Sequence, residues 1–93
     1  MYVAVVRAEL HLPYARSLKD KRQVLNRLKD RLRATHAAVA EVDHADLWQR
    51  TTLGMAVVTG APEGLTEMLH SLRDIVERQA EIVVLDWNVR HHE

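Results

Sequence analysis

The chain is predicted to adopt an α+β fold in which four antiparallel strands form one sheet and two helices cover one of its faces. Three observations predict this architecture. Apolar residues alternate with a period of two in four segments, they recur with a helical period in two others, and the segments follow the order β-α-β-β-α-β. A length of 93 residues fits a single domain, taken as residues 1–93, with one hydrophobic core.

The first two segments are a strand and a helix. Alternation from Tyr2 to Leu12 predicts a half-buried strand, which Pro13 ends because proline cannot donate to a sheet ladder. One face of this strand carries Ala4, Val6, Ala8, Leu10 and Leu12, and the other carries Val3, Val5, Arg7, Glu9 and His11. Ser17 is expected to cap a helix that runs to about Arg33. Its apolar face comprises Leu18, Val24, Leu25, Leu28 and Leu32.

The later segments complete the pattern. Residues 36–44 and 51–59 are expected to be strands, with the small residues Thr52, Gly54 and Ala56 on one face of the second. Pro62 fits the first turn of a helix that ends near Gln79. Residues 81–89 form the last strand, with Ile82 and Val84 on one face and Val83, Leu85 and Trp87 on the other.

Right-handed crossovers place both helices on the same face of the sheet, which is the arrangement of the ferredoxin-like fold. The opposite face is left uncovered although it carries apolar residues such as Val3 and Val5. An uncovered apolar surface favours self-association. A homodimer with two-fold symmetry is therefore the expected assembly.

Positive charge is concentrated in residues 16–33. This segment holds eight of the 13 basic residues and two acidic ones, a net charge of +6, whereas the whole chain is neutral. Five cations are candidate contacts to nucleic-acid phosphates: Arg16, Lys19, Arg22, Lys29 and Arg33. From Lys19 to Arg33 they would span about 21 Å of helix. The alternative is a solvated helix face, which the neutral total charge favours.

The other candidate sites give weaker signals. A loop with Leu47, Trp48 and Arg50 either folds back to cap the core or offers an apolar anchor to a partner. An RNA-stacking sheet is not expected, because the middles of the first and third strands lack aromatic residues. Gly54 within a strand indicates a bulge or a close approach.

No catalytic constellation, cofactor motif or metal site is predicted. Asp43, His44 and Asp46 are close in sequence, but Asp43 and His44 would point to opposite faces of a continuing strand. Ser17 and Ser71 have no partner base at a recognisable spacing. The chain has no cysteine, so a disulfide, a thiol nucleophile and a thiolate metal site are excluded.

Two segments resemble the YlxP-like family of small bacterial proteins, a domain of unknown function. They are residues 16–22 (RSLKDKR) and residues 40–50 (AEVDHADLWQR) followed by residues 52–58 (TLGMAVV). The resemblance covers essentially the whole chain and implies a ferredoxin-like fold without an established activity, cofactor or catalytic residue. The family's genes are often found near those of a translation initiation factor and a ribosome-binding factor, which implies a role near the ribosome.

Three hypotheses follow. The first is a non-enzymatic cytoplasmic module, without a membrane span, that binds RNA or the ribosomal surface through its first helix. The second is a structural or small-ligand-sensing homodimer that uses the open sheet face and has no nucleic-acid role. The third and weakest is an enzyme that uses Asp43, His44 and Asp46.

Overall fold

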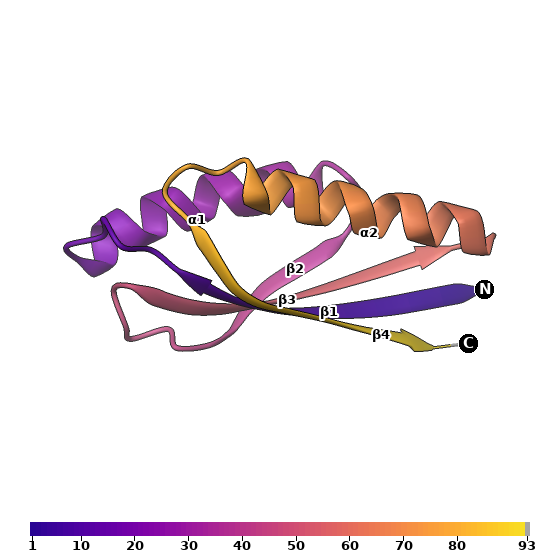
Figure 1. Ribbon diagram of the computed structural model, residues 1–93, viewed down its shortest axis with the longest axis horizontal. Coiled ribbons are helices and arrows are strands. Elements are labelled where there is room, and N and C mark those ends of the chain that lie inside the picture. Colours follow the sequence, from indigo (N-terminus) through magenta and orange to yellow (C-terminus); the bar gives the residue numbers. More distant parts are fainter. Residues whose placement is uncertain (93) are drawn as a thin grey trace.

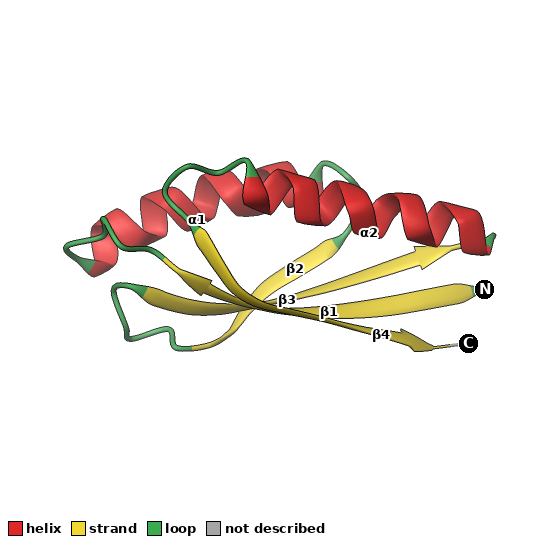
Figure 2. Cartoon of the chain, in the orientation of Figure 1, coloured by secondary structure: helices red, strands yellow, loops and turns green. Residues whose placement is uncertain are grey.

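The computed structural model describes residues 1–92 and has the predicted order of elements (Figure 1). The strands are β1 (Tyr2–His11), β2 (Ala38–Asp43), β3 (Arg50–Thr59) and β4 (Val83–His92), and the helices are α1 (Leu18–Arg33) and α2 (Pro62–Glu77). The strands form one antiparallel sheet in the order β2-β3-β1-β4. Both helices cover the same face of this twisted sheet (Figure 2), so the predicted ferredoxin-like fold is confirmed.

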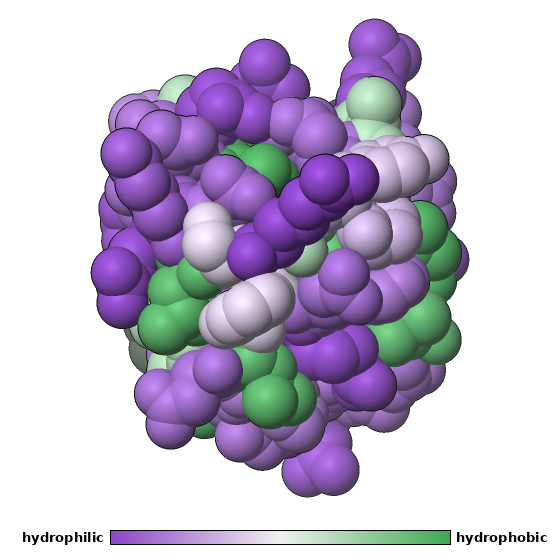
Figure 3. Space-filling model, turned by 90° about the vertical axis from the view of Figure 1, so that its left-hand side faces the viewer, coloured by the Kyte–Doolittle hydropathy of each residue, from purple (hydrophilic) through white to green (hydrophobic). Residues whose placement is uncertain are grey.

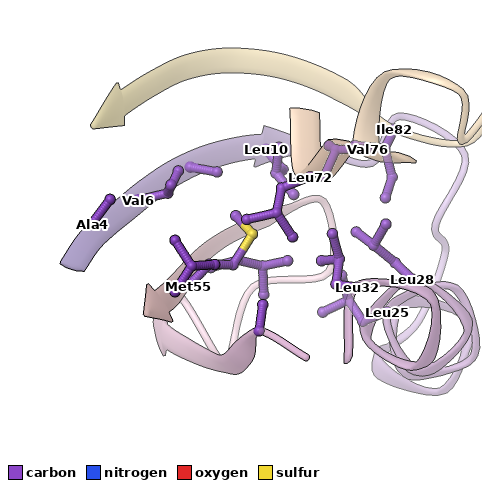
Figure 4. Packing of buried hydrophobic residues seen from close by; sticks show 14 of the residues in the cluster. Ala4, Val6, Leu10, Leu25, Leu28, Leu32, Met55, Leu72, Val76 and Ile82 are labelled. Atoms are coloured by element: carbon purple, nitrogen blue, oxygen red, sulfur yellow. The ribbon is translucent and has the colours of Figure 1, made fainter. Parts of the chain in front are cut away.

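The core lies between this face of the sheet and the two helices. Ala4, Val6, Ala8 and Leu10 of β1 are fully buried, as the alternating pattern predicted. They meet Leu25, Leu28 and Leu32 of α1 and Leu72 and Val76 of α2, many of which Figure 4 shows pointing toward one another. Burial of these aliphatic side chains is the main force that holds the helices on the sheet.

Local signals in the sequence set the ends of the helices. The Ser17 hydroxyl accepts a hydrogen bond from the Asp20 backbone N–H at 3.0 Å, which confirms it as the cap of α1. Pro62 occupies the first turn of α2, also as predicted. α2 ends at Glu77, two residues before the predicted Gln79, because the chain turns there and the Gln79 N–H bonds to the Val76 carbonyl.

β4 runs from Val83 to His92, whereas residues 81–89 were predicted, and it also contains an irregularity that the alternating pattern did not predict. Glu9 pairs with Asp86 and Leu10 pairs with Val84, so Leu85 is an extra residue that forms a β-bulge. Because the bulge reverses the alternation, Trp87 lies opposite Ala8 on the helix-covered face and does not share a face with Leu85. There the guanidinium of Arg73 on α2 lies 5.6 Å from the centroid of the Trp87 ring. The prediction that Val83, Leu85 and Trp87 share one face is therefore wrong.

Candidate nucleic-acid interface

Three basic residues of the 16–33 segment are bound within the protein. Arg27 forms an ion pair with Glu81, and Arg31 Nη1 donates to Gln79 Oε1 at 2.8 Å. Both contacts tie α1 to the connection between α2 and β4. The third residue, Lys21, is 1% exposed and lies on the buried face of α1. Lys21 is thus withdrawn from solvent, whereas Arg27 and Arg31 make contacts within the fold but remain at the surface.

The five candidate phosphate contacts are arranged differently. None of Arg16, Lys19, Arg22, Lys29 and Arg33 forms an ion pair with a carboxylate in residues 1–92. All are exposed except Lys29, which is half-buried. Arg33 Nη2 donates to the carbonyl of Val39 on β2 at 3.2 Å, which orients the guanidinium without neutralising its charge. We call these five residues the cationic row.

Lys21 instead builds a buried polar network that the sequence analysis missed. Its Nζ lies 2.9 Å from Glu41 Oε2 and donates to the carbonyl of His44 at 2.7 Å. The Thr51 hydroxyl donates to the same Glu41 oxygen. The net charge of +6 predicted for the segment therefore overstates the local field, because Glu41 neutralises Lys21. A signal was available, since Lys21 continues the helical spacing of Leu18, Leu25 and Leu28.

The network stabilises the charged form of Glu41. Burial alone raises the pKa of this carboxyl group, but the hydrogen bonds from Thr51 and Lys21 and the charges of Lys21 and Lys29 lower it further than burial raises it. The net result is a pKa below the ordinary value of 4.5. Glu41 is therefore ionised at neutral pH and holds Lys21 in place.

The same network fixes the loop between β2 and β3. Lys21 binds the carbonyl of His44 at the start of this loop, and Gln49 at its end reaches the segment before α1. Gln49 Nε2 donates to the carbonyls of Pro13 and Ala15 at 3.2 and 3.1 Å, and the Gln49 carbonyl accepts the Leu12 N–H at 2.9 Å. The loop from 44 to 49 is thus tied to the N-terminal end of α1.

Leu47 and Trp48 lie at the outer part of this loop. Leu47 is 48% exposed and Trp48 is 53% exposed, and neither belongs to the hydrophobic core. The core-capping interpretation of Trp48 is therefore wrong. Figure 3 looks at the end of the molecule that carries this loop and the start of α1, where apolar and near-neutral side chains lie among hydrophilic ones. The loop between β2 and β3, which carries Trp48, and the start of α1 thus lie at the same end of the molecule (Figure 1).

Arg50, the third residue of the predicted partner site, belongs to a polar cluster on the open sheet face. Its Nη2 lies 3.5 Å from Glu9 Oε2, and the Thr52 hydroxyl donates to the same oxygen at 2.7 Å. Arg7 Nε also lies 3.4 Å from Glu9. Glu9 thus pairs with the guanidinium of Arg50, while Arg50 still lines one surface hollow together with Leu47 and Trp48.

Asp43 and His44 come together in a way that the strand pattern did not predict. β2 ends at Asp43, and His44 adopts a left-handed backbone with a φ of 60°. This turn brings His44 Nδ1 to 3.9 Å from Asp43 Oδ1, and His44 Nε2 to 3.9 Å from Glu9. Within the described residues, no three His, Asp or Glu side chains are placed to hold a metal ion. The cluster is a set of polar contacts at the end of the sheet, in which the His44 backbone N–H donates to Asp43 Oδ1 at 2.7 Å.

The two helices carry opposite charges. α1 has seven basic and two acidic residues, a net charge of +5, whereas α2 has four acidic residues and Arg73, a net charge of −3. Because the helices lie next to each other on the sheet (Figure 1), the helical layer has a positive and a negative half. The cationic row lies in the positive half, where a polyanion would be attracted.

Comparison with known proteins places this arrangement in a family. Residues 3–89 match the family described as "Protein of unknown function (DUF503)". The chain belongs to the DUF503 family. Across 48 residues it is 40% identical to the uncharacterized protein YlxP of Bacillus subtilis, a match that covers 50% of this chain and 52% of that relative. The resemblance to YlxP-like proteins is thereby confirmed, and neither description assigns a reaction to the DUF503 fold.

Solved structures similar to this DUF503 chain share its fold. The designed protein Foldit4 superposes with a TM-score of 0.58 at 8% identity, over 100% of this chain and 98% of that one. The designed ferredoxin-fold protein LFR1 1 superposes with a TM-score of 0.54 at 12% identity, over 99% and 84%. At such low identities the likeness concerns the fold alone. In the part of the chain that the structure describes, neither helix is long and apolar enough to cross a membrane.

Proposed function

We propose that this DUF503 protein is a non-enzymatic module that binds structured RNA, such as the ribosomal surface, through the cationic row on and just before α1. One observation carries the proposal: the fold pairs Lys21 with Glu41 and Arg27 with Glu81, whereas the cationic row forms no ion pair with a carboxylate among residues 1–92. Cations that have no carboxylate partner among residues 1–92, one just before α1 and four along it, suit a polyanionic backbone, which offers regularly spaced phosphates.

Leu47 and Trp48 supply a second contact beside the start of the row. An exposed tryptophan can stack on an unpaired base. The hydrogen bonds of Lys21 and Gln49 hold the loop on both sides, so little order has to be gained on binding. We infer that the cations provide the affinity for phosphates and that Trp48 selects an unpaired or splayed base.

The test is the salt dependence of binding to a structured RNA hairpin, measured by fluorescence anisotropy. Contacts from all five cations predict that the logarithm of the association constant falls with the logarithm of salt concentration with a slope of about −3.5 to −4.5. Replacement of both Arg22→Glu and Lys29→Glu should abolish binding. The matched control combines Arg73→Glu on α2 with Arg78→Glu directly after it. This control changes the charge equally, at residues already paired with Glu77 and Asp74.

Wild-type binding that is absent or independent of salt would contradict the proposal. Equal losses in the α1 and α2 variants would also contradict it, because they would show a response to net charge instead of to the cationic row. Circular dichroism of each variant verifies that the fold is retained.

A second candidate function rests on a hollow in the open sheet face. This hollow has a volume of about 580 Å³ and is lined by Val5, Val42 and Gly54, with Arg7, Asp86 and Arg90 also around it. Val42 Cγ1 lies 3.0 Å from the point where a side chain on Gly54 would begin, so the glycine keeps this region open. A small-ligand-sensing role predicts a thermal shift with a compound that the variant Gly54→Val no longer shows, together with no RNA binding.

A further inference from the structure

The two edges of the sheet differ in how far they are protected. β2 has six residues, a register shift at Val42, and a carbonyl at Val39 that is already bonded to Arg33. β4 has ten residues and, among the described strands, pairs only with β1. After the bulge at Leu85 it is regular from 86 to 92 and contains neither proline nor lysine. Such an edge presents unpaired backbone groups that can bind another strand.

The side chains of this regular stretch form a self-complementary pattern. Asp86, Asn88 and Arg90 lie on the open face, and neither Asp86 nor Arg90 has an ion-pair partner within residues 1–92. Asp86 lies opposite Glu9 on β1, so two carboxylates face each other across this strand pair. On the helix-covered face, the half-buried Trp87 and Val89 pack against the edge of the core.

We propose that two copies of this chain form a dimer through antiparallel pairing of their β4 strands, with the two-fold axis at Asn88. Asp86 of each copy then lies opposite Arg90 of the other, and Trp87 of each copy lies opposite Val89 of the other. In each ion pair, the guanidinium of Arg90 from one copy places a positive charge next to Asp86 of the other copy. This charge offsets the repulsion between the carboxylates of Asp86 and Glu9. The two apolar pairs extend the core across the interface, as aromatic and β-branched residues do in neighbouring strands.

The geometry of a continuous sheet selects this register. Directly opposite residues of antiparallel strands share a face of the sheet. Both helical layers therefore lie on the same side only when even-numbered residues pair with even-numbered ones and odd-numbered with odd-numbered ones. A shift of the axis to Trp87 places Asp86 opposite Asn88 of the other copy, and a shift to Val89 places Asp86 opposite His92. The axis at Asn88 gives the pairing of Asp86 with Arg90. The edge dimer leaves the open sheet face uncovered, so it differs from the face-to-face dimer that the sequence favours, and it does not depend on RNA binding.

Disulfide trapping tests the geometry, because the chain has no cysteine of its own. Asn88 faces its own copy across the axis at a Cα separation of about 4.5–5.5 Å, within the range of a disulfide. The variant Asn88→Cys should therefore form a covalent dimer on mild oxidation. The control Val5→Cys lies on β1, where the two copies would be separated by three strand spacings, about 14 Å across the strands, in addition to an offset along them, and should not crosslink.

Charge reversal provides an independent measurement by analytical ultracentrifugation. The wild type should be a dimer, and Arg90→Glu should weaken the dimer at least tenfold because it places two carboxylates opposite each other. Adding Asp86→Arg to that variant should restore the wild-type affinity. A wild type that stays monomeric into the millimolar range, crosslinking of Val5→Cys but not Asn88→Cys, or no effect of Arg90→Glu would each overturn the proposal.

Discussion

Replacement of the buried lysine by methionine, Lys21→Met, tests whether its ion pair is a structural element. Methionine keeps most of the apolar stem of lysine and removes the ammonium group, which contacts Glu41 at 2.9 Å and the His44 carbonyl at 2.7 Å. The Lys21 side chain is 2% exposed and that of Glu41 is 19% exposed. Glu41 would keep the hydrogen bond from Thr51 but lose its counter-charge, and the carbonyl of His44 would lose its donor.

The expected cost follows from this geometry. Removal of one partner from a buried ion pair costs about 3–5 kcal/mol, and the lower end applies here because Glu41 keeps some solvent and one hydrogen bond. A loss of about 3 kcal/mol is a large part of a total stability of about 5–14 kcal/mol for a chain of this length. It should lower the melting temperature by roughly 12–24 °C.

Urea denaturation followed by circular dichroism gives the free energy of unfolding of each variant. The matched control is Lys19→Met on the exposed side of α1, which should change stability by less than about 0.5 kcal/mol. A double variant with Lys21→Met and Glu41→Leu should recover most of the loss, because an apolar pair can replace a buried ion pair. A cost below about 1 kcal/mol for Lys21→Met would refute the reasoning.

Four further predictions address single residues. Glu41→Gln should cost about 2 kcal/mol at neutral pH. The pKa of Glu41 in the folded state lies below its ordinary value of 4.5, so the ionised carboxylate contributes its full stabilisation above pH 4.5. Below pH 4.5 this stabilisation is lost as Glu41 is protonated, and the difference in stability between the variant and the wild type should shrink in acid titrations. His36→Gly should raise the free energy of unfolding by about 0.5–1 kcal/mol, because His36 has a left-handed φ of 71°. Trp48→Ala should lower stability by less than about 1 kcal/mol but weaken RNA binding several-fold, which thermal melting and anisotropy would separate. Gly54→Val should cost about 1–3 kcal/mol in urea denaturation, because its side chain would overlap Val42.

The alternating and helical patterns predicted most of the fold because burial follows them directly. Ala4, Val6 and Ala8 are buried as their spacing indicated, and the Ser17 cap and Pro62 marked the starts of the helices correctly. Leu85 broke the pattern because a bulge inserts one residue without any compositional sign.

The candidate site was less predictable because charge alone does not reveal which cations are already bound. Lys21 and Arg22 are adjacent and chemically similar, yet Lys21 is buried against Glu41 whereas Arg22 is exposed. The difference depends on a long-range contact between α1 and β2. The loop that carries Trp48 is likewise held by long-range contacts, from Gln49 to Pro13 and Ala15.

The opposite charges of α1 and α2 have a consequence for how the protein behaves before any contact is made. With a net charge of zero and a pI near 7.0, the molecule feels little overall force in a uniform field. Near a charged surface, however, its charge separation produces a torque that turns α1 toward anions and α2 toward cations. A single preparation should therefore be retained at low salt by both cation- and anion-exchange resins, with opposite helices against the two matrices. A polyanion would meet the molecule already oriented, with the cationic row in front.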